Sequence, residues 1–537
     1  MTVSRPIRFF HRGQVVEVDG LPPTTSVLSW LREHARCTGT KEGCNEGDCG
    51  ACTVVVAELS TDTPTAQTGA TRVGELLLRP VNACIRFLPT LDGRALLTVE
   101  DLQSIAAAAT PAPQAASLHP VQQALVDCHG SQCGFCTPGF AMTLTALYED
   151  HCEQRSRPSR RQVADALAGN LCRCTGYRPI LEAGQRMFEL PPRRLDTAPI
   201  AAALRAMSAG PALHYQGPAA SGNGAMQSLA APRRLDELAA LRVQQPEARL
   251  LAGCTDIGLW VNKQFRELGD ILYLGEVAEL KTVSLVDGWL AIGAAAPLED
   301  AWRALAAQVP SLTEMGVRFA GPPVRHAGTL VGNLANGSPI GDAAPVLMCL
   351  GARLLLRRGH QTRRVALDDF YLGYMKNRLE AGEFVQAVEV PLPPAGTQVR
   401  GYKLSKRYDC DISGLCAGLA LSLADDGSVR EARFAFGGMA AVVRRAVGAE
   451  AAVVGQPWSE VTARAAMAAL ERDFQPLSDL RASAAYRLKS ASNLLLRLWL
   501  ETRLQDPLPA AAVSVWADLE QGRGESAATS VLARSAP

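Results

Sequence analysis

The chain has 537 residues, of which 47% are hydrophobic, and its 54 Lys and Arg against 53 Asp and Glu give a formal net charge of +1. This length exceeds what one hydrophobic core serves, so we expect three or four globular domains. The balanced charge provides no basic excess for nucleic-acid binding. No segment offers the roughly 20 apolar residues of a membrane span, and the first residues carry no apolar signal region, so we expect a cytoplasmic protein.

The first 90 residues predict a small mixed domain. Residues 7–10 and 15–18 are β-rich runs around a short turn that contains Gly, which is typical of a hairpin. Ser26 can cap a helix, and residues 53–59 read as a strand.

A glycine-rich loop between that helix and that strand carries three cysteines. Cys44, Cys49 and Cys52 have C-x4-C-x2-C spacing, and 31 residues separate Cys52 from Cys84. This is the plant-type pattern for a [2Fe-2S] cluster. The intervening glycines would allow backbone N–H groups to approach the cluster sulfides. A four-cysteine zinc site is the alternative, although such sites usually pair two C-x2-C loops.

Residues 91–190 predict a helical domain with a second four-cysteine site. Cys133 and Cys136 form a C-x2-C loop just before one expected helix, and Cys172 and Cys174 form a C-x-C loop just after another. A bundle could bring these helix ends to one metal centre, and from spacing alone both iron and zinc remain open. Helix starts are expected at His119-Pro120, Thr137-Pro138, Ser159 (with Gln162 in a capping box) and Pro179.

The remaining chain divides by composition. Residues 191–225 are rich in Pro, Ala, Gly and Ser without periodicity, which predicts a mobile linker. Residues 226–400 resume alternating helix and strand signals. A hairpin and two helices over 401–518 predict an α+β domain, and residues 519–537 predict a flexible tail.

Two glycine-containing loops stand out within residues 226–400. The first, 249–258, is an apolar run that opens into a polar turn, and the second, 318–342, carries several Gly and Asn residues. Successive backbone N–H groups in such loops can bind an anion. Neither loop is a G-x-G-x-x-G motif after a strand, so a Rossmann domain is disfavoured. The eight histidines form no acid–base constellation.

Two cysteine motifs carry a resemblance to a known family. Gly-Ser-Gln-Cys-Gly-Phe-Cys-Thr-Pro-Gly at 130–139 and Gly-Asn-Leu-Cys-Arg-Cys-Thr-Gly-Tyr-Arg-Pro-Ile at 169–180 closely resemble the second [2Fe-2S] domain of the xanthine dehydrogenase and aldehyde oxidase family of molybdenum hydroxylases. The first cysteine set resembles that family's ferredoxin domain, which is a β-grasp fold. The resemblance implies one cluster at Cys44, Cys49, Cys52 and Cys84 and a second at Cys133, Cys136, Cys172 and Cys174.

The paired glycine loops resemble the family's FAD domain, which has a vanillyl-alcohol-oxidase-like fold. Gln132 resembles the family residue between the second cluster and the pterin, and Lys403 and Asp411 are implied near the flavin ring and on a loop that affects NAD access. The chain departs from the family at Cys254, where Gly or Asn is usual, which puts the turn geometry in doubt. The implied FAD positions are Leu251, Ala252, Gly253, Cys254, Thr255, Asp256 and Ile257 for the pyrophosphate, and Phe319, Ala320, Thr329, Gly332, Asn333, Asn336, Ser338 and Asp342 around the flavin and its phosphates.

The resemblance implies an electron-transfer subunit of the xanthine dehydrogenase type. A separate molybdopterin-binding subunit would oxidise hypoxanthine or xanthine to urate, in an assembly of two small and two large subunits. Electrons would pass through two [2Fe-2S] clusters and FAD to NAD, because clusters carry single electrons and NAD accepts a hydride. The alternatives are a subunit of an aldehyde, nicotinate or carbon monoxide hydroxylase, an oxygen-reducing oxidase, and a zinc-stabilised interaction protein.

Overall fold

The computed structural model describes residues 4–60, 68–108, 118–222 and 224–514. The chain divides into two compact units. Unit 1 comprises Met1–Ser338, Gly351–Leu392 and Lys406–Ile412, and unit 2 comprises Pro339–Leu350, Pro393–Ser405 and Ser413–Pro537. The expected multidomain α+β class is confirmed, whereas the predicted tail at 519–537 lies outside the described residues. In the ranges just given, no helix is both long and apolar enough to cross a membrane.

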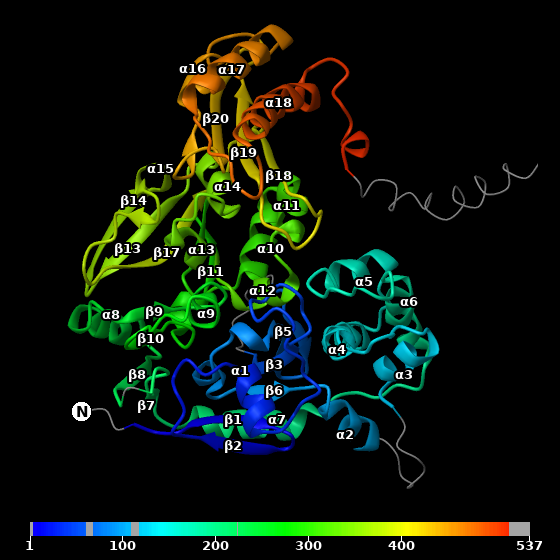
Figure 1. Cartoon of the computed structure of the whole chain (residues 1–537). Coiled ribbons are helices and arrows are strands. Elements are labelled where there is room, and N and C mark those ends of the chain that lie inside the picture. Colours follow the sequence, from blue (N-terminus) through cyan, green and yellow to red (C-terminus); the bar gives the residue numbers. More distant parts are fainter. Residues whose placement is uncertain (1–3, 61–67, 109–117, 223, 515–537) are drawn as a thin grey trace, which may run out of the picture. The chain divides into compact units, whose positions relative to one another are not determined.

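A six-stranded mixed sheet forms the N-terminal domain of unit 1 (Figure 1). The strand order is β2-β1-β6-β3-β5-β4; the expected hairpin is the antiparallel pair β1 and β2, and the expected strand is β3. Ser26 caps the first helix by accepting the Ser29 N–H at 3.0 Å. The elements are β1 (Ile7–His11), β2 (Gln14–Val18), α1 (Val27–Ser29), β3 (Thr53–Leu59), β4 (Thr71–Val73), β5 (Leu76–Asn82) and β6 (Ala95–Leu97).

The helical domain follows, and the four predicted helices begin within one residue of their expected starts (Figure 1). Ser159 and Gln162 form the expected capping box. His129 takes the left-handed conformation (φ 56°) after the helix that ends at Asp127. The helices are α2 (Asp101–Ala108), α3 (Pro120–Asp127), α4 (Thr137–Glu153), α5 (Arg160–Ala166) and α6 (Arg178–Arg186).

The predicted mobile linker at 191–225 is wrong for most of its length. Helix α7 (Thr197–Ser208) buries Ile200, Leu204 and Met207, and β7 (Leu213–Pro218) is an edge strand of the next sheet. These three side chains recur at the i, i+4 and i+7 spacing of one helix face. Alanines separate these three residues, so the Pro, Ala, Gly and Ser content of the segment does not indicate a helix.

Two further sheets complete unit 1. One has the order β7-β8-β10-β9, and the other has the order β11-β12-β17-β13-β14, with β15 and β16 as a small separate pair. The strands are β8 (Met226–Ala231), β9 (Arg249–Leu251), β10 (Ile271–Tyr273), β11 (Val283–Val286), β12 (Trp289–Gly293), β13 (Arg353–Arg358), β14 (Gln361–Ala366), β15 (Tyr371–Gly373), β16 (Lys376–Asn377) and β17 (Phe384–Pro391). The helices are α8 (Leu235–Gln244), α9 (Ile257–Asn262), α10 (Leu298–Gln308), α11 (Thr313–Arg318), α12 (Pro322–Ala327), α13 (Leu330–Asn336) and α15 (Leu367–Phe370).

Unit 2 is a four-stranded antiparallel sheet with helices, and it has its own core. The order is β18-β19-β20-β21; β19 and β20 form the expected hairpin, and α17 and α18 are the two expected helices. The elements are α14 (Ala343–Cys349), β18 (Gln398–Leu404), β19 (Leu415–Leu423), β20 (Val429–Gly437), β21 (Arg444–Arg445), α16 (Val447–Ala451), α17 (Glu460–Asp473) and α18 (Ala484–Thr502).

Candidate functional site

The first four predicted cysteine ligands come together beside β3 and β5. Hydrogen bonds from the thiols of Cys49 and Cys84 lower the pKa of Cys44, whereas the hydrogen bonds of Cys84 to Cys44 and Cys52 raise the pKa of Cys84. Cys52 and Cys84 are buried, and Cys44 and Cys49 are half-buried. Four thiols in mutual contact fit a cluster ligated by sulfur. Within the described ranges, no group of three or more His, Cys, Asp or Glu side chains is arranged to hold a single metal ion.

Glycines shape the loop that carries these thiols. Gly47 (φ 80°) and Gly50 (φ 71°) adopt the left-handed conformation that favours glycine, and a Cβ at Gly43 would lie 2.9 Å from the Cys49 Sγ. The Cys49 N–H donates to the Cys44 Sγ at 3.3 Å. A backbone donor on a ligand sulfur is the type of hydrogen bond that tunes an iron–sulfur cluster.

The second set of four cysteines lies at helix ends, as predicted, and is more exposed. The thiol of Cys136 contacts that of Cys172, and Cys133 contacts Cys174, with Cys133 and Cys174 exposed. Burial raises the pKa of Cys136 to about 12. Burial also acts to raise the pKa of Cys172, but Thr175 lowers it by donating its N–H at 3.5 Å and its hydroxyl at 3.2 Å to the sulfur.

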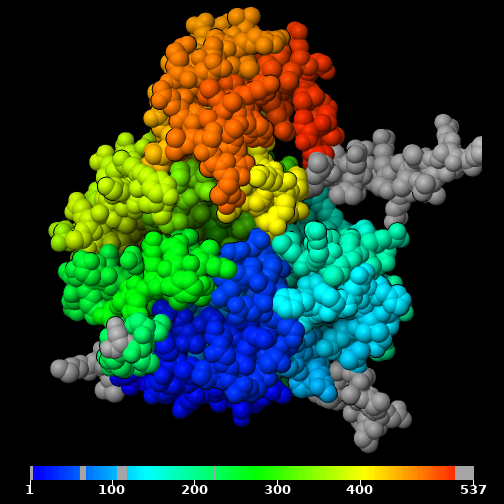
Figure 2. All heavy atoms as spheres, in the orientation of Figure 1, coloured from blue at the N-terminus to red at the C-terminus, as the bar shows by residue number. Residues whose placement is uncertain are grey.

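Direct hydrogen bonds join the two cysteine sites. The Leu171 N–H, next to Cys172, donates to the Cys49 carbonyl at 2.9 Å, and Asn170 Nδ2 donates to the Gly50 carbonyl at 3.0 Å. Figure 2 shows the helical domain (cyan) packed against the sheet domain (blue). The sequence does not predict the role of Asn170, since its partner is 120 residues away.

The first predicted flavin loop follows β9 and leads into α9. Cys254 takes a left-handed conformation (φ 68°), and its carbonyl accepts the Gly258 N–H at 2.7 Å. A Cβ at Gly253 would overlap the Ala327 carbonyl, so the backbone there needs glycine. Burial raises the pKa of the Cys254 thiol to about 12, which makes it a neutral packing group. The turn therefore accommodates a cysteine where the family usually has Gly or Asn.

The second loop is held by an arginine that the sequence does not single out. Phe319 packs against Trp302 with ring centroids 5.5 Å apart, and Ala320 is left-handed (φ 50°). Buried Arg325 donates to the carbonyls of Phe319 and Ala320 at 3.0 and 2.9 Å and pairs with Glu299 at 2.5 Å. Its guanidinium thus fixes a strained backbone next to two predicted flavin contacts.

Helix α13 places other predicted flavin residues. Thr329 caps the helix by accepting the Gly332 N–H at 3.1 Å. Asn333 lies one turn on, and its Oδ1 is buried with no hydrogen-bond partner in the described part of the chain. Asn336 ends the helix, and Ser338 follows it. A buried amide oxygen without a partner fits a bound group that donates a hydrogen bond.

Asp342 and Lys403 form a buried ion pair within unit 2. The Lys403 Nζ lies 2.5 Å from Asp342 Oδ2 and donates to the Ser413 hydroxyl at 2.9 Å. The second carboxylate oxygen, Asp342 Oδ1, is buried without a partner among the described residues. It is therefore available to a ligand that donates a hydrogen bond. The sequence predicts Asp342 and Lys403 but not Ser413.

Asp411 organises its own loop. Its carboxylate accepts the N–H groups of Arg407 and Ile412, both at 2.9 Å. Arg407 also lies 3.3 Å from Asp48, which belongs to the loop of the first cysteine set. The loop that carries Asp411 is thus attached to that cysteine loop.

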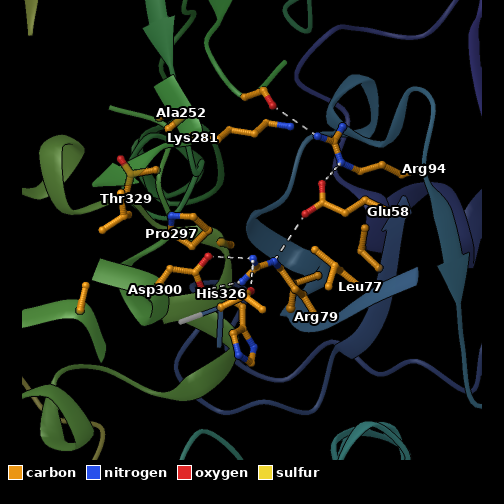
Figure 3. Close-up of a pocket in the computed structure, with 18 of the residues that line it drawn as sticks. Glu58, Leu77, Arg79, Arg94, Ala252, Lys281, Pro297, Asp300, His326 and Thr329 are labelled. Carbon is orange, nitrogen blue, oxygen red and sulfur yellow. Dashed lines mark hydrogen bonds and ion pairs between the residues drawn. The ribbon is translucent and has the colours of Figure 1, made fainter. Parts of the chain in front are cut away.

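A cavity of about 270 Å³ borders the six-stranded sheet and the first flavin loop (Figure 3). Glu58 lies 3.6 Å from both the Arg79 and the Arg94 side chains, and Lys281 extends into the cavity. Burial alone would raise the pKa of Glu58, but Lys281, Arg94 and Arg79 lower it to about 2. Arg79 also pairs with Asp300 at 2.9 Å and Arg94 with Glu276 at 2.6 Å, so both guanidinium groups are engaged by carboxylates. Two residues of the predicted flavin set line the cavity, Ala252 and Thr329.

Four domain models match the chain in succession. Residues 9–85 match a 2Fe-2S iron-sulfur cluster binding domain, and residues 98–185 match a [2Fe-2S] binding domain. Residues 224–393 match the FAD binding domain in molybdopterin dehydrogenase, and residues 400–502 match the CO dehydrogenase flavoprotein C-terminal domain.

Curated relatives are similar over most of this chain. The xanthine dehydrogenase of Emericella nidulans is 31% identical over 530 residues, which cover 87% of this chain and 36% of that protein. The xanthine dehydrogenase/oxidase of Gallus gallus is 29% identical over 527 residues, which cover 84% of this chain and 36% of that protein. The chain therefore spans just over a third of the length of these relatives.

One solved structure is similar to about half of the chain. It is the carbon monoxide dehydrogenase from Hydrogenophaga pseudoflava that lacks the Mo-pyranopterin moiety of the molybdenum cofactor. It is 28% identical, with a TM-score of 0.48, and the match covers 50% of this chain and 94% of that chain.

Proposed function

Since the chain belongs to the molybdenum hydroxylase family as an iron–sulfur and FAD-binding member, we propose that it is the electron-transfer subunit of a xanthine dehydrogenase. Its partner would be a molybdopterin-binding subunit that oxidises hypoxanthine and xanthine to urate. The complex would hold two subunits of each kind and work in the cytoplasm with NAD as the acceptor.

The observation that carries this proposal is the hydrogen bond from Leu171 N–H to the Cys49 carbonyl. It joins a residue adjacent to a ligand of the proposed second cluster to a ligand of the proposed first cluster. Cys133 and Cys174 are exposed, which suits entry of electrons from a partner, whereas Cys52 and Cys84 are buried. The chain's own residues thus support an order from the second cluster to the first.

The eight cysteines and the flavin loops are the proposed binding sites. When bound, the clusters supply one-electron transfer, and FAD supplies the exchange between single electrons and a hydride. Within unit 1, Asn333 would offer a buried oxygen to FAD and Gly253 would admit it closely. Within unit 2, Lys403 holds the Asp342 carboxylate in place, and its free oxygen would suit a hydrogen-bond donor of a ligand. Phe319 and Ala320, held by Arg325, would lie against the flavin.

The test is co-purification of the full chain with its partner, followed by a substrate screen. We expect the complex to contain molybdopterin, two [2Fe-2S] clusters and FAD, and to reduce NAD with hypoxanthine or xanthine. A stable, active chain that retains no molybdopterin subunit would refute the assignment. Stoichiometric zinc without iron–sulfur and flavin absorption would support an interaction protein, and faster turnover with oxygen than with NAD would indicate an oxidase.

A second candidate is the corresponding subunit of another molybdenum hydroxylase. The observation that favours it is the match of residues 400–502 to the CO dehydrogenase flavoprotein C-terminal domain. Activity with carbon monoxide, an aldehyde or nicotinate in the same screen, without activity on purines, would select this candidate.

A further inference from the structure

Asn262 is the last residue of α9, and its side chain reaches the loops of the first cysteine set. Its Nδ2 donates to the Cys84 carbonyl at 2.7 Å, to Asn45 Oδ1 at 3.1 Å and towards the Asn45 carbonyl at 3.3 Å. We propose that Asn262 is a positioning residue that joins two ligand segments of the first cluster and sets its reduction potential. This inference rests on the proposed function, which places a cluster at those cysteines.

The contacts of Asn262 span two segments that are distant in sequence. Asn45 adjoins Cys44 in the glycine-rich loop, whereas Cys84 is the isolated fourth cysteine after β5. Asn45 is in a left-handed conformation (φ 56°), and its side-chain oxygen faces the Asn262 amide. A single NH₂ group has two hydrogens, so it can serve both segments at once. The separation of the Cys44 and Cys84 ligands therefore depends on this amide.

Helix α9 is docked firmly enough for this role. A Cβ at Gly258 would lie only 2.7 Å from the Ile85 carbonyl, so the helix lies directly against the segment that follows Cys84. The same helix begins at the end of the first predicted flavin loop, at Ile257. Asn262 thus links the cluster segments to the element next to the proposed flavin phosphates.

The direction of the effect follows from electrostatics. A reduced cluster carries one more negative charge than an oxidised cluster, and the Asn262 amide offsets the negative partial charge of the Cys84 and Asn45 carbonyl oxygens next to the ligands, which favours the reduced form. Removing the Asn262 amide should therefore lower the reduction potential of the first cluster. The neighbouring pair Lys263–Glu46 is 3.9 Å apart with both side chains exposed, so it should contribute little.

The experiment compares Asn262→Leu with Lys263→Ala in the full chain, with clusters and FAD bound. Redox titration followed by electron paramagnetic resonance reports both clusters, and the second cluster serves as an internal reference. For Asn262→Leu we expect about a tenfold fall in the ratio of reduced to oxidised first cluster at a fixed potential, which is about 59 mV for one electron. The second cluster and the Lys263→Ala variant should be unchanged.

Selective loss of the first cluster signal, with the second retained, would also support the positioning role. An intact first cluster with an unshifted potential in Asn262→Leu would overturn it. If that variant loses both clusters, Asn262→Ser, which keeps a small polar side chain, is judged by the same two criteria. Absence of clusters from the unaltered chain would instead refute the proposed function, so the two failures are distinguishable.

Discussion

The buried pair of Lys403 and Asp342 yields the first prediction at the scale of single residues. Lys403→Met leaves the Asp342 carboxylate buried without its cation, which should cost about 3–5 kcal/mol of unfolding free energy. The double variant Lys403→Met/Asp342→Leu should recover most of that stability but should still bind FAD weakly. Urea unfolding and FAD content measure the two effects.

Lys403→Ala addresses the flavin role of the same residue. Loss of the cation should change the potential of the bound flavin and, in the proposed complex with NAD as acceptor, the rate of NADH oxidation. If both quantities are unchanged while FAD stays bound, Lys403 has only a structural role.

Asn170 is a second residue with a specific expectation. Its Nδ2 donates to the Gly50 carbonyl and to the Thr53 hydroxyl, and its Oδ1 accepts from Thr143 at 2.8 Å. Asn170→Ala leaves buried polar groups unpaired, so we expect a loss of about 1–3 kcal/mol and a lower iron content. Thermal unfolding and iron analysis test this.

Gln123→Ala is the matched control for Asn170→Ala. Gln123 donates to Asp127 on an exposed helix surface, so its truncation should be nearly neutral. Equal losses in the two variants would contradict a special role for Asn170.

The grouping of the cysteines could be predicted from the sequence, whereas the residues that support their loops could not. The local C-x4-C-x2-C spacing of Cys44, Cys49 and Cys52 indicates that they belong together. Asn262 and Arg325 donate to backbone carbonyls. Every residue type has a backbone carbonyl, so the sequence does not indicate which carbonyls accept these bonds. Their partners also lie in segments that only the folded chain brings near, as with Asn262 and Cys84.

At the scale of elements, the cap of α3 predicts a pH effect. His119 is fully buried, and burial lowers its pKa to about 4. The unfolded chain, with an ordinary pKa of about 6.5, binds the proton more readily, so stability present above pH 6.5 declines as the pH falls towards 4. His119→Asn keeps a capping side chain but has no group that titrates here. Its unfolding free energy should therefore fall less with decreasing pH, by up to about 3 kcal/mol. Urea midpoints between pH 5 and 7.5 measure it, and parallel curves for both proteins would contradict it.

The start of α4 predicts a steric effect. A Cβ at Gly139 would overlap the Gly50 carbonyl, so Gly139→Ala should separate the helix from the first cysteine loop. We expect about 1–3 kcal/mol of destabilisation and reduced iron content. Gly373→Ala is the control, because nothing lies within 4 Å of its Cβ position and its φ is not left-handed. A Gly139→Ala variant with unchanged stability and full iron content would contradict this prediction, since the contact between residue 139 and the Gly50 carbonyl would then adjust to the added Cβ.

Elements with local signals are predicted well, and those without them are not. Strand β3 matches its prediction residue for residue, and Ser159 with Gln162 marks the start of α5. Helix α7 is not predicted, because Pro199 lies in its first turn and alanines separate its larger apolar residues. The π-helical continuation at Trp30–His34 has no sequence signal that distinguishes it from an α-helix.

At the scale of the whole molecule, the exposed surface around the second cysteine set predicts a partner contact. Val126 on α3 is 59% exposed, and Phe135 and Tyr177 are also exposed near the cysteines. Val126→Asp should reduce co-purification of the proposed molybdopterin subunit without reducing iron content. Val286→Asp on β11, also 59% exposed, is the control. Equal co-purification with both variants would place the partner elsewhere.

The order of the two cysteine domains and the flavin domain could be predicted, because each of these three carries its own cysteine or glycine motif. The contacts between domains could not, because they rest on Leu171, Gly50 and other positions that are ordinary in the sequence. The pairing of Arg407 with Asp48 is similar, since either residue alone reads as a surface charge.

The bonds to Cys49 and Gly50 also bear on dissecting the chain. A fragment that ends near residue 100 would lose the Leu171 N–H that the Cys49 carbonyl accepts, and it would lose the Asn170 amide from the Gly50 carbonyl, which still accepts from the N–H and hydroxyl of Thr53. Solvent exposure is one of the properties that set a cluster's potential. We therefore expect the isolated N-terminal part, if it binds the proposed cluster, to show a different reduction potential from the full chain, because the Cys49 carbonyl next to a proposed ligand would then face water.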